Sequence, residues 1–379
     1  DVDNGIDRHT PCRPDAGFFS RLNQMIRLIH TLAQITGITV GNFWRHFVYG
    51  RDRLRPVYAI YEMTYACNMN CTYCDDGTGN SYPDQIGKSR PLELADAKRM
   101  LGFLRRELPA IYLCGGEPTI HPDFLSILAE IDRLGFYPVL MNTNGLMLPR
   151  LLERDPDMFR RIDILIISMD STDPNVLDRL YRSKKGDGQR VIDVIKAYKK
   201  TIKGSGCKVV INCVITEETI DDAMKVMNFC IDEDIAFAPV PANRGKGLMH
   251  RFQEIREYGA LVDRMLSAEG PRLFGSRKVF QILMRFKSFE CHPALRLHIT
   301  PDGMIPWPCQ SDQRFKLTVF DYESLDALLL DAEKRHSVQG HGRRCKSPCY
   351  LVQNVSTHVY LKNPLTLTAS AVRDLLIKI

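Results

Sequence analysis

Three cysteines are gathered in one short segment of the chain, Cys67-Asn68-Met69-Asn70-Cys71-Thr72-Tyr73-Cys74. The segment before it, Val57 to Thr64, is rich in β-branched and aromatic residues and predicts a buried strand. The segment after it, Asp75 to Asn80, is polar and contains glycine, which predicts a loop. Structural zinc sites and cubane iron–sulfur clusters usually take four protein ligands. Three thiols on one loop therefore favour a cluster with one iron open to a non-protein ligand.

A second motif, Gly115-Gly116-Glu117-Pro118, follows the apolar segment 111–114. The CxxxCxxC spacing after a first strand, the aromatic Tyr73 before the third cysteine and this GGEP turn after a second strand occur in the expected order. Together they resemble the radical S-adenosylmethionine (radical SAM) enzymes. The resemblance covers about residues 55–252 and implies a partial (βα)6 barrel of the TIM type.

The resemblance also implies roles for these residues. Cys67, Cys71 and Cys74 would hold a 4Fe–4S cluster whose open iron is chelated by S-adenosylmethionine. Gly115 and Gly116 would let the backbone approach the methionine moiety, and Glu117 would face its ammonium group. Further cofactor contacts are expected from Tyr73, Asn142, Asn144, Ser168, Asp170 and, more weakly, Asn212. The alternatives are a tight turn at the glycines and a helix N-cap at Ser168 and Asp170.

Strand-like and helix-like segments alternate along residues 55–252, which predicts an α/β fold with a parallel sheet. The expected strands are 57–64, 110–114, 137–142, 162–169, 208–215 and 235–240, and the expected helices are 91–106, 123–134, 190–203 and 218–232. Parallel barrels carry their chemistry at the carboxyl ends of the strands. The polar motifs around Glu117, Asn142 and Ser168 all fall at such ends, which supports the expected fold from within the sequence.

Residues 1–54 form an N-terminal segment of their own. Apolar residues recur at helical spacing from Phe18 to about Ile35, and we expect Gly37 and Gly41 to end this helix. A short apolar stretch, 43–49, follows, and arginines flank both parts. One interpretation is a helical cap packed on the barrel. The other is a surface that touches a membrane or an amphiphilic substrate.

The last third of the chain contains a second cysteine set: Cys291, Cys309, Cys345 and Cys349. A hairpin turning at 301–303, a helix over 324–336 and the final cysteine pair resemble the twitch extension of radical SAM enzymes, a shorter relative of the SPASM domain. This resemblance implies a small α+β domain, 253–350, with an auxiliary iron–sulfur cluster. A structural zinc ribbon with four cysteine ligands is the alternative. Residues 351–379 are expected to form a tail with a last helix, 368–379.

Composition limits the other possibilities. The net charge of +6, from 51 basic and 45 acidic residues, is mild and does not call for nucleic acid. The first residues form no signal peptide and lack Met, so we expect the native start to lie upstream. Twelve cysteines without an export signal favour a reducing, cytoplasmic compartment and metal ligation, with membrane association as a further expectation.

The resemblance therefore implies an enzyme, an oxidoreductase or maturase. It would cleave S-adenosylmethionine reductively and use the 5′-deoxyadenosyl radical to remove hydrogen from an unactivated C–H bond. We expect oxidation of, or bond formation on, a natural-product, peptide, sugar or lipid substrate, with a flavodoxin- or ferredoxin-type electron donor. One alternative is an epimerase in which Cys213 or Cys230 returns a hydrogen atom. The non-enzymatic alternative is a cysteine-rich zinc or iron–sulfur scaffold.

Overall fold

The computed structural model describes residues 16–48, 54–245, 247–337 and 349–363. Seven strands form one parallel sheet in the order β6-β5-β4-β3-β2-β1-β9. Their bounds are β1 (Tyr58–Glu62), β2 (Ala110–Cys114), β3 (Val139–Thr143), β4 (Ile164–Ser168), β5 (Lys208–Ile215), β6 (Ala236–Pro241) and β9 (Arg296–Ile299). Within the described residues, β6 and β9 do not pair with each other, so the sheet is an open, partial barrel and the expected α/β fold is confirmed.

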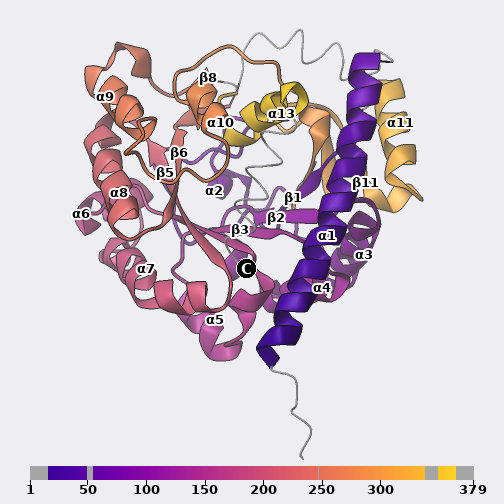
Figure 1. Ribbon diagram of the computed structural model, residues 1–379, viewed down its shortest axis with the longest axis horizontal. Helices are drawn as coiled ribbons and strands as arrows, with labels where there is room; N and C mark the ends of the chain where they lie inside the picture. The colour runs from indigo at the N-terminus through magenta and orange to yellow at the C-terminus, as the bar shows by residue number, and fades with distance from the viewer. Residues whose placement is uncertain (1–15, 49–53, 246, 338–348, 364–379) are drawn as a thin grey trace, which may run out of the picture.

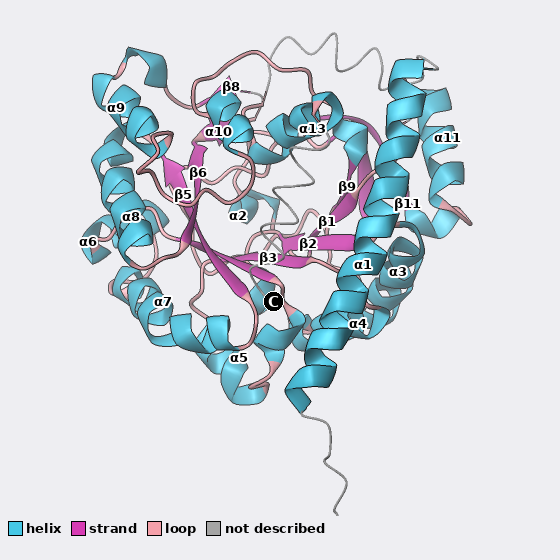
Figure 2. Cartoon of the chain, viewed as in Figure 1, coloured by secondary structure: helices cyan, strands magenta, loops and turns pink. Residues whose placement is uncertain are grey.

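Helices connect successive strands and cover the outside of the sheet (Figures 1 and 2). They are α3 (Leu94–Glu107), α4 (Phe124–Leu134), α5 (Leu148–Arg154), α6 (Pro174–Tyr181), α7 (Asp187–Gly204), α8 (Ile220–Asp232), α9 (Arg256–Met265) and α10 (Arg277–Leu283). Their apolar sides and the outward side chains of the strands form the main core, in which Leu101, Ile111 and Ile127 are fully buried. This packing holds the carboxyl ends of the strands in fixed positions.

The N-terminal helix α1 runs from Ala16 to Phe43 and continues as a π-helical turn, η1 (Trp44–Val48). The prediction that Gly37 and Gly41 end the helix was wrong. A glycine inside a helix costs only about 1 kcal/mol relative to alanine, and contacts on the inner side offset that cost. Thr31 Oγ1 donates to the carbonyl of Tyr137 (3.1 Å), and the Asn42 side chain exchanges hydrogen bonds with the backbone of Arg55 (2.8 and 3.0 Å).

The inner side of α1 also closes the amino end of the barrel. Leu28 is buried against Ile164, Ile166 and Val210, which point into the barrel from β4 and β5. The expected cap packed on the barrel is therefore present. The half of the barrel near the carboxyl ends of the strands remains open to a ligand.

The C-terminal third differs from the expected hairpin. Residues 301–303 do form a turn, in which Gly303 N donates to Thr300 O (2.9 Å) and Gly303 has a φ of +75°. The strand before the turn, however, is β9, which pairs in parallel with β1 and extends the main sheet across the expected boundary at residue 252. The hairpin is formed instead by β10 (Met304–Cys309) and β11 (Asp312–Thr318).

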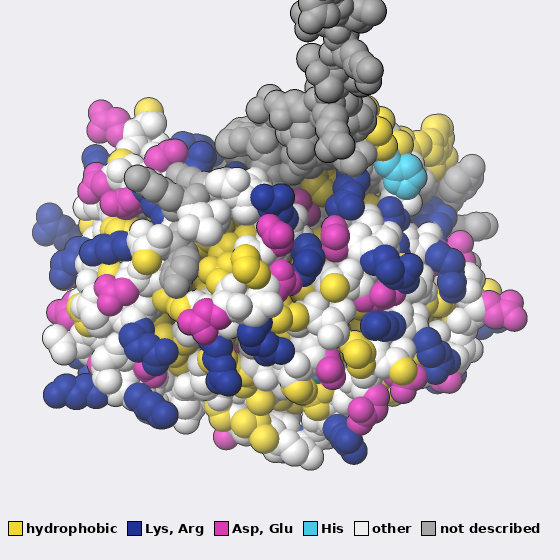
Figure 3. All heavy atoms as spheres, turned by 90° about the horizontal axis from the view of Figure 1, so that it is seen from below, with side chains coloured by type: hydrophobic (Ala, Val, Ile, Leu, Met, Phe, Trp, Pro, Cys, Tyr) yellow, Lys and Arg dark blue, Asp and Glu magenta, His cyan; other side chains and the backbone are white. Residues whose placement is uncertain are grey.

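Shorter elements complete the described chain: α2 (Tyr82–Gln85), β7 (Asn243–Arg244), β8 (Gly247–Leu248), α11 (Leu325–Arg335) and α13 (Val352–Lys362). The expected helix 368–379 lies outside the described residues. In the described part of the chain, no helix has the length and apolar character needed to cross a bilayer. On the face shown in Figure 3, basic and acidic side chains are interspersed, so the net positive charge is not concentrated there.

Candidate functional site

The cysteine loop is held in place by backbone hydrogen bonds to α6. Asn70 N donates to Tyr181 O (2.9 Å) and Thr72 N donates to Leu180 O (2.8 Å). Within the loop, Cys74 N donates to Cys71 O (3.0 Å). The loop conformation is therefore fixed by a helix about a hundred residues further along the chain, before any ligand is considered.

Cys67, Cys71 and Cys74 line one cavity of about 310 Å³ at the carboxyl ends of the strands. This volume is at the lower end of the roughly 300–1,000 Å³ typical of small-molecule sites. Burial raises the pKa of all three thiols, to about 11 for Cys67. A bound metal reverses this effect, because a coordinating thiol is deprotonated outright. Three buried thiols that face one cavity are thus suited to metal ligation.

The two glycines of the GGEP motif are required by close packing against the segment that leads into the cysteine loop. A Cβ on Gly115 would lie 2.4 Å from Thr64 O, and one on Gly116 would lie 2.3 Å from Ala66 O. Gly116 N donates to Thr64 O (2.8 Å) and so joins the ends of β2 and β1. Both glycines line the cavity, but the structural reason for them is this backbone contact.

Glu117 is 1% exposed and acts as a connector between strand ends. Its Oε1 accepts hydrogen bonds from Thr119 and from Thr143 Oγ1 (2.8 Å), and its Oε2 accepts from Asn144 N (2.7 Å). Burial raises the pKa of Glu117, and these hydrogen bonds oppose the rise. A carboxylate oxygen can accept two hydrogen bonds, so Oε2 retains the capacity for a second donor from the cavity.

The other expected cofactor contacts divide into two groups. Asn142, Asn144 and Ser168 line the cavity, and the buried Asn142 Oδ1 has no hydrogen-bond partner among the described residues. Asn144 Nδ2 donates to Asn68 Oδ1 (2.7 Å) and so ties the end of β3 to the cysteine loop.

Asp170 and Asn212 do not line the cavity. Asp170 is fully buried, accepts a hydrogen bond from the hydroxyl of Tyr73 and another from Val214 N (2.6 Å), and burial raises its pKa to about 7. Tyr73 and Asp170 thus support the loop together, and Asp170 is placed for this contact rather than for one with the cofactor.

Comparison with known proteins bears directly on this site. The sequence model of the Radical SAM superfamily matches residues 61–230, which include the cysteine loop, the GGEP turn and the carboxyl ends of β1 to β5.

Residues 61–230 of this chain form a radical SAM domain.

The sequence identity of this chain to individual relatives is low. It is 24% identical over 290 residues to the GTP 3′,8-cyclase of Mannheimia succiniciproducens, covering 71% of this chain and 80% of that one. It is 26% identical over 309 residues to the GTP 3′,8-cyclase of Haemophilus ducreyi, covering 75% and 84%. A structure of Streptococcus suis SuiB bound to precursor peptide SuiA superposes with a TM-score of 0.53 at 17% identity. That match covers 72% of this chain and 64% of SuiB, less than two thirds of its length, and supports the shared fold.

Radical SAM enzymes use a 4Fe–4S cluster and S-adenosylmethionine, and the donor set fits both. Among the described residues, no three His, Cys, Asp or Glu side chains are grouped closely enough for a single metal ion. Three buried thiols on one loop that line one cavity suit a 4Fe–4S cluster that leaves one iron open to another ligand. The cavity also supplies an unpartnered acceptor, Asn142 Oδ1, for the polar groups of a nucleoside. The match to the Radical SAM superfamily indicates an enzyme and argues against the alternative of a non-enzymatic zinc or iron–sulfur scaffold.

The second cysteine set is partly described. Cys309 ends β10, and Cys349 is buried with its Sγ 3.7 Å from Ser311 Oγ. Burial raises the pKa of Cys309, and the nearby Cys349 adds to the rise. Cys291 is half-buried before the turn 293–295, and Cys345 lies outside the described residues.

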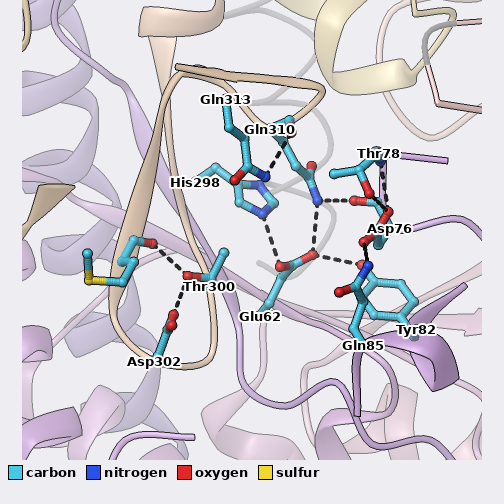
Figure 4. A network of polar contacts seen from close by, with 12 residues as sticks. Glu62, Asp76, Thr78, Tyr82, Gln85, His298, Thr300, Asp302, Gln310 and Gln313 are labelled. Atoms are coloured by element: carbon cyan, nitrogen blue, oxygen red, sulfur yellow. Dashed lines mark hydrogen bonds and ion pairs between the residues drawn. The ribbon is translucent and has the colours of Figure 1, made fainter. Parts of the chain in front are cut away.

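A polar network links this enzyme's two cysteine regions across the cavity (Figure 4). Glu62, the last residue of β1, is 1% exposed and accepts hydrogen bonds from Tyr82 (2.8 Å) and from Gln310 Nε2 (3.1 Å). His298 Nε2 lies 3.3 Å from the other oxygen of Glu62. Gln310, which follows Cys309, also donates to the backbone carbonyl of Asp76, just after the cysteine loop.

Sequence reasoning missed Glu62, Tyr82, Arg296, His298 and Gln310, all of which line the cavity. A signal was present for three of them. Arg296 and His298 alternate in a strand, so their side chains share one face. Glu62 is the one charged residue in the otherwise uncharged segment 57–64.

The two thiols expected as hydrogen donors do not face the cavity. Cys213 and Cys230 are 0% and 1% exposed, pack in the main core and do not line the cavity. Among the described cysteines outside the two ligand sets, Cys114 does line it; this residue ends β2 and is in register with Glu62. The period-two alternation places Cys114 on the inner face with Tyr112, whereas Cys213 points to the outer face.

Proposed function

We propose that this radical SAM enzyme abstracts hydrogen from an unactivated C–H bond and completes an oxidation or bond formation with the help of a second iron–sulfur cluster. When bound, the first cluster and S-adenosylmethionine supply a 5′-deoxyadenosyl radical for the abstraction. The observation that carries the proposal is the shared cavity. The three-thiol loop lines this cavity, and the hairpin that carries Cys309 reaches it through Gln310, which bonds to Glu62 and to the backbone of Asp76.

The protein's own residues bind, orient and exclude water. Cys67, Cys71 and Cys74 hold the first cluster, while Tyr73 and Asp170 fix the loop that carries them. Glu117 Oε2 is available to an ammonium group, and Asn142 Oδ1 to a hydroxyl or amine of the nucleoside. Ser168 and Asn144 complete the polar lining.

The second cluster is proposed to be held by Cys291, Cys309, Cys345 and Cys349. Four thiolates would saturate its irons, so it would relay one electron rather than bind substrate. Such a cluster suits removal of the electron left on a substrate radical. We further propose a flavodoxin- or ferredoxin-type donor for the first cluster, and a reducing compartment.

The substrate class is proposed from the cavity and the relatives together. SuiB is solved with a precursor peptide, and the curated relatives are named as cyclases of GTP. In this chain Arg296 lines the cavity and makes no ion pair with any described residue. A natural-product or peptide substrate that carries an anionic group is therefore the first class to screen.

Iron content tests the proposed second cluster. Anaerobic reconstitution should give roughly eight irons per chain for two cubanes, and about half that number in the Cys309→Ala/Cys349→Ala variant. The matched control is Cys213→Ala/Cys230→Ala, which should keep the full content because both thiols are in the apolar core. About four irons in the unmodified protein would remove the second cluster from the proposal.

Epimerisation is a second candidate function, and the position of Cys114 favours it. A thiol that faces the cavity can return a hydrogen atom to a substrate radical, which would leave the second cluster a structural role. Cleavage of S-adenosylmethionine without substrate in deuterated water tests whether the 5′-deoxyadenosyl radical can reach the exchanged thiol of Cys114. The 5′-deoxyadenosine should then contain deuterium. Loss of this deuterium in Cys114→Ser, but not in Cys213→Ser, would support the function. Unlabelled product from the unmodified enzyme would count against it.

A further inference from the structure

The outer side of α1, and of the η1 turn that continues it, carries exposed apolar side chains from Ile26 to Phe47. Ile26, Ile29, Val40, Phe43, Trp44 and Phe47 are each about half exposed, from 47% for Phe43 to 60% for Ile29. They recur at helical spacing. Among the exposed positions between them, Ala33 and Gly37 are small and uncharged, whereas His30 and Thr36 are polar. We call the six apolar residues, together with Ala33 and Gly37, the outer face of α1.

The outer face is a feature of the folded helix and not an unpacked end. The opposite side of α1 is anchored by buried Leu28, Thr31 and Asn42, through the contacts to the barrel described above. Figures 1 and 2 show α1 lying along the outside of the molecule beside α3 and α4. At about 1.5 Å per residue, the outer face extends for roughly 30 Å. Single exposed apolar residues need no explanation, but six of them along one side of a helix over this length do.

The charge of the helix indicates what covers this face. Residues 16–48 contain no Asp or Glu, whereas they contain Arg21, Arg27 and Arg45. Arg27 pairs with Asp132 of α4 (3.2 Å), and Arg45 makes no ion pair with any residue that the structure describes. Aromatic residues beside cations on a helix without acidic groups are typical of helices that lie in the interface of an anionic bilayer.

We propose that the outer face of α1 docks this enzyme on an anionic membrane surface, with the helix parallel to the bilayer. Phe43, Trp44 and Phe47 would enter the boundary between headgroups and acyl chains. Arg45 would contact lipid phosphate. The barrel behind α1 would remain in water, since α1 lacks the apolar character needed to cross the membrane. This inference is independent of the reaction proposed above.

The two tryptophans give a direct readout. Trp44 is 50% exposed on the outer face, whereas Trp307 is 3% exposed in the core. Phosphatidylglycerol vesicles added to the full chain should shift the tryptophan emission to shorter wavelength, and brominated acyl chains should quench the shifted part. Co-sedimentation should show binding to these vesicles and much weaker binding to phosphatidylcholine vesicles.

Substitution of the face tests its role. Phe43→Ser/Trp44→Ser/Phe47→Ser should lower the partition coefficient on phosphatidylglycerol vesicles about tenfold or more, because three apolar side chains no longer enter the bilayer. The control is Ile231→Ser/Phe320→Ser, which removes exposed apolar side chains from other surfaces and should bind like the unmodified chain. Circular dichroism and melting of each variant confirm that the fold is retained.

Several results would overturn the proposal. Equal binding of the triple variant and the unmodified chain would show that the outer face is not the contact. Equal binding to both kinds of vesicle would remove the anionic surface as the partner. A lipid-free dimer in sedimentation velocity that the triple variant abolishes would assign the face to a second copy of this chain instead.

Discussion

At Gly116 the chain has no room for a single methyl group. The three atoms nearest to a Cβ at this position all belong to the backbone of Tyr65 and Ala66, at 2.3 to 2.8 Å, so no side chain can move aside. The contact joins the end of β2 to the entry of the cysteine loop through Gly116 N and Glu117 N, which donate to Thr64 O and Ala66 O (2.8 and 2.9 Å). The position of the thiols thus depends on a residue that has no side chain.

We predict that Gly116→Ala lowers the free energy of unfolding by about 2 kcal/mol or more and reduces the iron retained after reconstitution. Gly259→Ala is the control. Gly259 is exposed inside α9, has nothing within 4 Å of its Cβ position, and should gain up to about 1 kcal/mol from the change. Chemical denaturation and iron analysis measure both effects. A Gly116→Ala protein as stable as the control would refute the close approach.

Sequence motifs predicted these residue-scale roles only in part. The pattern CxxxCxxC and GGEP identified which residues matter, because spacing along one loop or turn is a local property. It did not distinguish a residue that lines the cavity from one that supports the lining. Asp170 was expected at the cofactor, but its carboxylate accepts hydrogen bonds from Tyr73 and from Val214 N. This follows from the register of β4 against β5, which the sequence does not show.

At the scale of elements, α4 depends on a neutral histidine at its start. His121 is 5% exposed, and its Nδ1 accepts a hydrogen bond from Asp123 N (3.1 Å) at the beginning of the helix. Burial lowers the pKa of His121 below 6.5, and protonation of Nδ1 would remove this acceptor. The stabilisation is therefore present above about pH 6.5 and is lost as the pH falls through the lowered pKa.

We predict that the protein loses about 1 kcal/mol of stability from this site between neutral and mildly acidic pH. His121→Asn keeps a side-chain acceptor for the amide two residues on but cannot be protonated there. Melting curves of the two proteins should diverge below about pH 6.5, with the variant less sensitive to acid. Parallel curves over that range would show that His121 is not the group responsible.

Elements with strong local signals were predicted well, and those decided by tertiary contacts were not. The bounds of β2 and β5 coincide with the expected strands 110–114 and 208–215, which are short apolar runs between turns. Helix α1 continues through two glycines because contacts with Tyr137 and Arg55 hold it. Strand β9 joins β1, a partner more than two hundred residues earlier, and local pattern carries no information about that pairing.

At the scale of the whole molecule, one cavity at the carboxyl ends of seven strands brings together the cysteine loop, the glycine turn and the C-terminal hairpin. We infer that the three thiols of the loop hold the cluster at which S-adenosylmethionine is cleaved. The geometry that supports it is the set of buried thiols, Cys67, Cys71 and Cys74, facing that cavity.

The most direct test is the formation of 5′-deoxyadenosine from S-adenosylmethionine by the anaerobically reconstituted protein with dithionite. The unmodified enzyme should form it, and Cys67→Ala/Cys71→Ala/Cys74→Ala should form none. The matched control, Cys207→Ala/Cys230→Ala, removes thiols buried in the core and should retain the reaction. If the triple variant still forms 5′-deoxyadenosine at the rate of the unmodified enzyme, the cysteine loop is not the site of cleavage and the account is wrong.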